Sequence, residues 1–427
     1  MGALPYLLKE IKADVYVSPF TFGVVNELLK KNHITGARLK VVRQKETRRI
    51  GGRQVIFFPV THSYPQTYGF GIQTAHGYIV YSGEFIADYD DFSDAYHGDY
   101  SFATRFKNDG VFILLQDSKS ADRPLHTAPK HKVSDHFDKL LSDYEKRRVF
   151  VEIYTQSVYR IQEMIQCCIE HHRKICFYTK EIQHLVTLLQ SVMDPIPAEL
   201  IVTEDQIDQL DDVVVIISGQ GRQLFQLMSN IANSEVDNIE IRESDVFVVA
   251  TPLVPGVEND FKNMENDIYK KEGTIIKIDR DVKGMHPSKE DLKMVIYMTE
   301  PKYYIPIKGA YRMLYANAMT AEEMHIPSDH IIIIDNGEII TFKNGELQPG
   351  REVLELHDSL IDGNADWDVA GVVLKDREIL STDGVMVLAI GLDFKTKEIV
   401  NGPDIQTRGL VYVRDAEYLT REVTRIM

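Results

Sequence analysis

The order of apolar and polar residues divides the chain into three stretches. Strand-length apolar runs dominate residues 14–118, and two of them flank the turn Ala75-His76-Gly77, which predicts a β-hairpin. From residue 149, short apolar runs alternate with longer amphipathic segments, which predicts strand–helix–strand units and a parallel sheet. After residue 358 the pattern is again typical of strands.

The predicted strands are residues 14–17, 37–42, 54–61, 68–73, 78–81, 111–116, 149–153, 175–178, 213–218, 246–251, 274–278, 303–307, 331–335, 371–374, 385–390 and 409–413. The predicted helices are residues 21–31, 158–172, 180–193, 221–233, 259–271, 289–299, 311–324 and 415–427. Both chain ends look abrupt, as in a fragment: residues 4–8 read like the middle of a helix, and residues 425–427 end on an apolar pair.

Composition narrows the class of protein. The chain has 427 residues, 44% of them hydrophobic, and only three cysteines, so we expect a globular protein of about two or three domains without a disulfide framework. No apolar run reaches the roughly 18 residues of a membrane span, and the first residues do not form a signal peptide. We therefore expect a cytoplasmic protein without a membrane partner.

The charge of the whole chain and the charge of its first 53 residues lead to different expectations about nucleic-acid binding. The net charge of −16 argues against indiscriminate coating of nucleic acid, because such binding depends on Lys and Arg. Residues 1–53 nevertheless carry eleven Lys and Arg against four Asp and Glu. This stretch either follows a phosphate backbone or belongs to an edge strand that its charges protect from aggregation.

A first candidate for chemistry is His62, which ends an apolar strand. Glu84 follows after the predicted hairpin, in Ser82-Gly83-Glu84-Phe85. Histidine and carboxylate at the ends of neighbouring strands are a common way to present metal ligands, although a histidine at a strand end is more often a hydrogen-bonded structural residue.

Two turns are candidates for phosphate binding. Lys283, Gly284, His286 and Ser288 lead from a strand into a helix, where free N–H groups favour a phosphate or where Ser288 or His286 serves as a plain helix cap. The second turn follows a parallel strand, at the sheet edge where open α/β sheets bind ligands. Its residues are Ser218, Gly219, Gln220 and Arg222.

Two histidine-containing groups look like metal sites but are better explained otherwise. Cys167 and Cys168 precede a His pair, yet Cys168 lies on the apolar repeat of a predicted helix, so we expect core cysteines. His126, His131 and His136 lie in a stretch of mixed charge, and we expect them on the surface.

Several motifs taken together resemble ribonuclease J, a family of bacterial metallo-β-lactamase/β-CASP nucleases, over nearly the whole chain. They are Thr61-His62-Ser63-x-Pro65, Ser82-Gly83-Glu84-Phe85, Gln116-Asp117-Ser118, Thr251-Pro252 with Pro255-Gly256, His286-x-Ser288-x-Glu290, Pro301-Lys302-Tyr303 with Gly309-x-Tyr311-Arg312, and Gly402-Pro403 with Thr407-Arg408-Gly409.

The resemblance implies an α/β architecture in which a β-CASP domain interrupts a metallo-β-lactamase domain. The expected boundaries are 1–118 and 286–345 for the β-lactamase domain, 119–285 for the β-CASP domain, 346–368 for a linker and 369–427 for the start of a small α+β carboxyl-terminal domain. It also implies two zinc ions and exonuclease and endonuclease activity on RNA.

Departures from the family pattern fall at the positions of its metal ligands. The family's His-x-His-x-Asp-His motif would precede Gly2, His62 matches the next ligand, and Glu84 stands where a bridging Asp is usual. Lys308 stands where the final ligand histidine belongs, and only His286 remains of the family's 5′-phosphate-binding turn. A protonated lysine repels a metal dication, so we expect zinc to bind weakly or not at all.

These departures favour a ribonuclease J-like protein of RNA processing and mRNA decay that is catalytically degenerate. It would bind RNA, not DNA, and act as a subunit beside an active paralogue or as a homo-oligomer. Two alternatives stay open: an active zinc-dependent nuclease whose first metal motif lies outside this sequence, and an assembly module that does not contact RNA.

Overall fold

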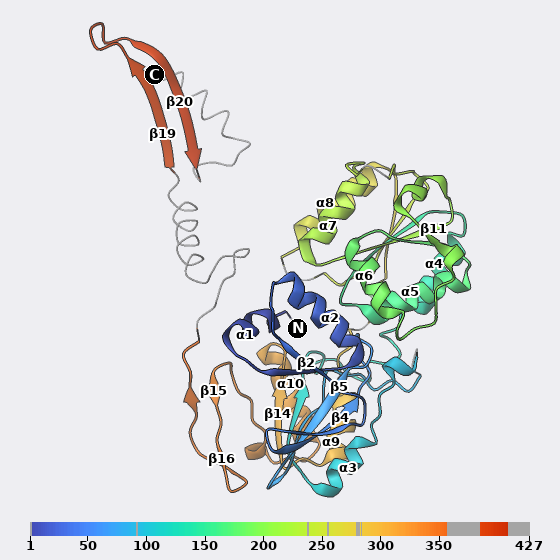
Figure 1. Cartoon of the computed structure of the whole chain (residues 1–427), viewed down its shortest axis with the longest axis vertical. Helices are drawn as coiled ribbons and strands as arrows, with labels where there is room; N and C mark the ends of the chain where they lie inside the picture. The colour runs from blue at the N-terminus through green and yellow to red at the C-terminus, as the bar shows by residue number, and fades with distance from the viewer. Residues whose placement is uncertain are drawn as a thin grey trace. The chain divides into compact units, whose positions relative to one another are not determined.

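The computed structural model describes residues 2–90, 93–236, 239–253, 256–278, 282, 284–356 and 385–408. The chain divides into two compact units. Met1–Asp335 and Thr341–Gln348 form the first, and Asn336–Ile340 and Pro349–Met427 form the second. Figure 1 shows the first unit with its two sheets.

A mixed six-stranded sheet forms one half of the first unit, in the order β14-β7-β6-β5-β4-β3. Strands β3 to β6 are antiparallel neighbours, whereas β7 pairs in parallel with both β6 and β14. Their bounds are β3 (Thr47–Ile50), β4 (Arg53–Pro59), β5 (Tyr68–Thr74), β6 (Gly77–Tyr81), β7 (Val111–Asp117) and β14 (Tyr303–Ile307). The turn at residues 75–76 joins β5 to β6, which confirms the predicted hairpin.

Three helices cover one face of this sheet: α3 (Phe102–Asp109), α9 (Lys289–Thr299) and α10 (Tyr311–Glu323). Their apolar sides meet those of the strands in one core, where Phe58 stacks on Phe102 with 3.6 Å between ring centroids. A separate parallel pair of strands, β1 (Asp14–Val17) and β2 (Arg38–Val41), is joined by α2 (Pro19–Lys31) and preceded by α1 (Leu4–Glu10).

The second sheet of this unit is entirely parallel, in the order β10-β9-β11-β8-β12-β13, as the alternating pattern predicted. Its strands are β8 (Val149–Tyr154), β9 (Lys174–Phe177), β10 (Ile201–Val202), β11 (Val213–Gly219), β12 (Val246–Val249) and β13 (Thr274–Lys277). Helices lie on both faces, drawn from green to yellow in Figure 1. One core contains α4 (Ser134–Asp143), α5 (Val158–Glu170) and α6 (Lys180–Leu189), and the other contains α7 (Gly221–Ala232) and α8 (Glu258–Lys270).

The chain leaves the mixed sheet after β7, builds the parallel sheet, and returns to pair β14 with β7. This is the metallo-β-lactamase/β-CASP architecture that the sequence motifs imply. The short remaining elements are η1 (Asp94–Tyr96), η2 (Ala198–Leu200), η3 (Glu204–Gln209), η4 (Ser328–His330), β16 (Phe342–Lys343) and β17 (Glu346–Leu347).

In the second unit, β15 (Glu338–Ile339) pairs with β18 (Glu352–Val353), and β19 (Val385–Leu392) pairs with β20 (Ile399–Arg408), both antiparallel. The predicted strands 371–374 and 409–413 and the helix 415–427 lie outside the described residues. Among the helices that are described, none is long and apolar enough to cross a membrane.

Two expectations were wrong. The predicted strand at residues 331–335 is a single bridge between Ile331 and Tyr304. His131 is fully buried rather than on the surface, because its ring packs against Tyr159 and reaches Asp88. Cys167 and Cys168 lie in the core, as predicted.

Candidate functional site

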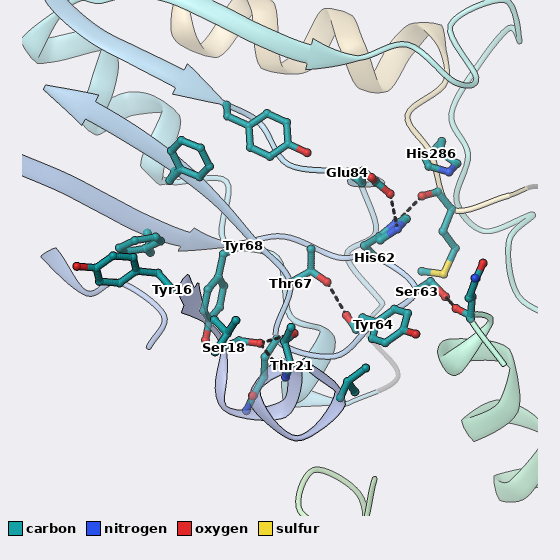
Figure 2. Close-up of a pocket in the computed structure, with 18 of the residues that line it drawn as sticks. Tyr16, Ser18, Thr21, His62, Ser63, Tyr64, Thr67, Tyr68, Glu84 and His286 are labelled. Atoms are coloured by element: carbon teal, nitrogen blue, oxygen red, sulfur yellow. Dashed lines mark hydrogen bonds and ion pairs between the residues drawn. The ribbon is translucent and has the colours of Figure 1, made fainter. Parts of the chain in front are cut away.

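A cavity of about 1180 Å³ opens where the two sheets of the first unit meet. The side chains at its polar end come from the mixed sheet, the parallel sheet and the segment that returns from one to the other. Figure 2 shows part of this lining. The polar residues include His62, Ser63, Glu84, Lys119, Gln156, Ser157, Arg160, Gln220 and His286. The other end is apolar and lies among residues such as Tyr16, Val42, Phe57, Tyr68 and Phe70.

His62 and Glu84 face each other after the ends of strands β4 and β6. An antiparallel bridge between Thr61 and Ile86 holds the two segments together, and the amide of Ile86 donates to the carbonyl of Thr61 over 2.9 Å. The distance between His62 Nε2 and Glu84 Oε2 is 3.0 Å (Figure 2). The structure therefore brings together the two residues that the sequence predicted as neighbours.

The protonation of His62 follows from its surroundings. Burial and the neighbouring His286 lower the pKa of His62 to about 3, so the ring is neutral at pH 7. Its Nδ1 lies 2.7 Å from the carbonyl oxygen of Met285 and must donate its proton to it. A backbone carbonyl that fixes one ring nitrogen in this way is common among metal-binding histidines.

Lys308 lies next to this pair, immediately after strand β14. The backbone there has a positive φ of 61°, and the amide of Ser118 donates to the carbonyl of Ile307 over 2.9 Å. The Lys308 ammonium contacts Glu84 Oε1, on the carboxylate whose other oxygen faces His62. Burial lowers the pKa of Lys308, although its side chain stays 40% exposed.

A second histidine, His286, pairs with a buried carboxylate. Its Nδ1 lies 2.6 Å from Oδ2 of Asp117, which ends strand β7 and is fully buried. The rings of His62 and His286 are 5.3 Å apart at their centroids. Sequence reasoning used Asp117 only as part of a family motif. Asp117 lies at the carboxyl end of a buried strand that has a parallel neighbour, and this position could have identified it as a candidate site residue.

The predicted phosphate-binding turn is only partly at the cavity. Gly284 and His286 line it, and Lys283 lies outside the described residues. Ser288 is fully buried, and it forms a capping box with Asp291 at the start of α9. Its hydroxyl lies 2.7 Å from that of Thr127, so Ser288 serves as the plain helix cap.

The turn after β11 also lies only partly at the cavity. Gln220 lines the cavity, whereas the hydroxyl of Ser218 is 2.8 Å from that of Thr155 and the carbonyl of Gly219 accepts from the Thr155 amide. Arg222 points elsewhere, because its Nε donates to Asp260 on α8 over 2.9 Å. Of this group, only Gln220 contributes a side chain to the cavity.

Part of the basic stretch near the amino terminus is paired with carboxylates within the fold. Arg38 and Lys40 both pair with Asp14, and Lys45 pairs with Asp99. Strands β2 and β3 each lie at the edge of their sheet. This placement favours the interpretation that the charges protect edge strands.

The residues at the cavity do not fit a pair of zinc ions. Among the described residues, no three His, Cys, Asp or Glu side chains are grouped so that they could hold a metal ion. The candidate ligands are His62 and Glu84, and the ammonium of Lys308 already contacts this carboxylate. Zinc sites need three or four donors without a competing cation, and these two described side chains do not meet that requirement.

Comparison with known proteins gives matches of two kinds. The family model "Ribonuclease J, beta-CASP domain" matches residues 146–268, and the model "Ribonuclease J C-terminal domain" matches residues 372–427. Among curated proteins, Ribonuclease J 2 of Staphylococcus aureus (strain NCTC 8325 / PS 47) is 29% identical over 431 residues, covering 99% of this chain and 76% of the relative. Ribonuclease J 2 of Staphylococcus epidermidis (strain ATCC 35984) has the same identity and coverage.

A solved structure supports the fold. The crystal structure of a protein of unknown function from Enterococcus faecalis V583 matches with a TM-score of 0.53 at 15% identity, covering 80% of this chain and 76% of that one. The two family models match successive parts of the chain, and the Staphylococcus relatives align over nearly all of it. On this evidence, the chain belongs to the ribonuclease J family.

Proposed function

We propose that this protein is a ribonuclease J-like subunit of bacterial RNA processing and mRNA decay that binds RNA without hydrolysing it. Its partner would be an active ribonuclease J paralogue or a second copy of the chain, in the cytoplasm. The proposal uses the family's action on RNA and departs from it only at the metal site. The predicted domain boundaries are part of this proposal.

The observation that carries the proposal is the contact between Lys308 and Glu84. At 4 Å and an effective dielectric constant near 20, two unit charges of the same sign repel by about 4 kcal/mol, and a dication doubles this. A metal at Glu84 would have to displace the ammonium or deprotonate it. The same ammonium attracts phosphate, so the substitution removes a metal while keeping the cavity suitable for RNA.

The polar lining supports RNA as the ligand. Lys119 supplies positive charge to the lining, and Gln156, Ser157 and Gln220 supply neutral donors from the segments that follow strands of the parallel sheet. Lys308 lies beside the lining, where its ammonium contacts Glu84. Such a lining suits a sugar–phosphate backbone, because contacts to phosphates need donors and cations rather than a fixed base sequence.

The test combines metal content with RNA binding. The protein, produced from its natural amino terminus, is equilibrated with zinc and manganese, freed of loosely bound metal, and analysed for metal per chain. Fluorescence anisotropy measures its affinity for labelled single-stranded RNA at several salt concentrations. We expect less than one tightly bound metal per chain, no cleavage, and affinity that falls with salt. RNA affinity that does not depend on salt, or none, would favour the assembly module.

One observation favours the alternative of an active zinc nuclease. The pair of His286 and Asp117 is intact, and His62 has the orientation of a metal ligand. A histidine held by a buried carboxylate is suited to move a proton during hydrolysis. Two tightly held metals together with RNA cleavage would replace our proposal with this one.

Partnership needs its own measurement. The chain is mixed with an active ribonuclease J, and molar mass is followed by light scattering during size-exclusion chromatography. A mass equal to the sum of both chains supports the hetero-oligomer, and a multiple of this chain alone supports the homo-oligomer.

A further inference from the structure

Helix α10 presents two large aromatic side chains to the solvent. Tyr311 is 61% exposed and Tyr315 is 53% exposed, although most tyrosines of the first unit lie in its cores or cavity. The two residues are one turn apart and share a face, since positions i and i+4 of a helix are neighbours. The helix turns another side inward, which is buried through Asn317, Thr320 and Ala321.

This exposed face begins next to the proposed RNA site. Lys308, which contacts Glu84, is followed almost directly by the start of α10 at Tyr311. The first turns of the helix lie along the segment that follows β7. Asn317 Nδ2 donates to Ser118 Oγ over 2.9 Å, and the Arg312 guanidinium pairs with Asp122.

We propose that Tyr311 and Tyr315 form a stacking platform for two neighbouring bases of a single-stranded RNA whose phosphates lie near Lys308. The proposal rests on the proposed function, because it requires that the protein bind RNA. It goes beyond the proposed function by naming the part of the RNA that is recognised. The tyrosines would contact the faces of the bases and would not distinguish their hydrogen-bonding edges.

Charge favours RNA over a protein partner. The segments that border the tyrosines, residues 118–126 and 308–315, contain Lys119, Arg123, Lys308 and Arg312 but only one acidic residue, Asp122. This local excess of positive charge stands in a chain of net charge −16, and it would attract a phosphate backbone to this face.

The chemistry of the face leads to the same occupant. Tyr311 and Tyr315 are the exposed large hydrophobic residues of α10, and no exposed aliphatic side chain accompanies them among the described residues of the helix. Docking helices usually bury an aliphatic stripe as well. Aromatic rings beside cations are typical of proteins that bind single-stranded nucleic acid with little sequence preference.

The test uses Tyr311→Ala, Tyr315→Ala and the double variant, with Tyr311→Phe and Tyr315→Phe as conservative replacements. Tyr269→Ala is the matched control, since Tyr269 is 60% exposed on α8 of the parallel sheet. Anisotropy measures binding of a labelled oligoadenylate and of an abasic ribose–phosphate strand of equal length. Thermal unfolding checks that each variant is folded.

Each alanine variant should bind oligoadenylate roughly tenfold more weakly, which is the loss expected for one stacked base. The phenylalanine variants and Tyr269→Ala should bind like the unaltered protein. The abasic strand should bind all of them equally, and the slope of affinity against salt should not change, because no phosphate contact is removed.

The outcomes separate the platform from the proposed function. An unaltered protein without affinity for RNA contradicts the proposed function and the platform with it. An unaltered protein that binds RNA, together with a double alanine variant that binds it equally well, shows that only the platform is wrong. A double variant that changes the molar mass of the protein but not its RNA affinity assigns the face to a protein contact and also overturns the platform.

Discussion

Two cations of the first unit, Arg148 and Lys308, illustrate the difference between a structural and a functional charge. Arg148 is 1% exposed, and its guanidinium donates to both oxygens of Asp245 over 2.8 and 2.6 Å, to Asp208 over 2.5 Å and to the carbonyl of Glu240 over 2.6 Å. Lys308 is 40% exposed, and the contact that the structure gives its ammonium is with Glu84.

The difference lies in how many donors are used. A guanidinium has five N–H donors, and most of those of Arg148 have acceptors inside the fold. An ammonium has three donors, so the contact with Glu84 leaves Lys308 able to bind a further acceptor. A saturated cation holds the fold together, whereas a cation with remaining donors stays available to water or to a ligand.

The largest expected effect is a loss of stability when Arg148 loses its buried partner. Asp245→Ala should lower the free energy of unfolding by about 3–5 kcal/mol, because it leaves a buried guanidinium without its main partner. Urea denaturation measures the loss. Asp211→Ala is the control: Asp211 pairs with Arg242 but is 79% exposed, and its loss should change stability by less than about 0.5 kcal/mol. Equal effects at both positions would contradict the comparison.

The next effect concerns a buried carboxyl group, Glu163. Burial raises the pKa of Glu163 to about 7, although the amides of Val133 and Ser134 donate to it and lower it. Between about pH 5 and 7 the folded state therefore holds a proton that the unfolded state has lost, and stability should fall as pH rises. The fall amounts to roughly 3 kcal/mol for this pKa difference.

Glu163→Gln should remove that part of the pH dependence. The measurement is urea denaturation of both proteins at pH 5 and pH 8, and the difference between their slopes isolates Glu163 from other titrating groups. Parallel pH profiles would mean that Glu163 stays ionised in the folded protein.

A smaller effect, on metal affinity, is expected when Lys308 is replaced. Lys308→His removes the repulsion of about 4 kcal/mol per unit charge and adds a third donor beside His62 and Glu84. We expect Co²⁺ to bind at least roughly tenfold more tightly, a change visible in its absorption spectrum. Lys308→Met, which removes the charge without adding a donor, should not gain this site. Tight binding of Co²⁺ by the unaltered protein would show that Lys308 does not exclude metal.

The smallest effect is on the salt dependence of RNA binding. Lys308→Met should reduce the slope of log affinity against log salt by about 0.7 if the ammonium contacts one phosphate of a single strand. Its effect on stability should be about 1 kcal/mol or less, because the ion pair is partly exposed. An unchanged slope would place Lys308 away from the RNA backbone.

The elements that the sequence predicted well are those whose pattern is local. Residues 289–299 form α9 as predicted, and the strand–helix alternation from residue 149 produced the parallel sheet. Both follow from periodicity along one segment. Short elements were missed, such as β3 (Thr47–Ile50) and α3 (Phe102–Asp109), because their patterns are too brief to separate from those of loops.

The sequence by itself determined the parallel sheet, the hairpin, the core cysteines and the motifs that relate the chain to its family. Only the tertiary structure decided which candidate residues act together. His286 meets Asp117 across 169 positions of sequence, Lys308 reaches Glu84, and Ser288 turns inward to cap a helix. The physical reason is that pairing and burial depend on distances between strand ends, which tertiary packing sets and spacing along the chain does not encode.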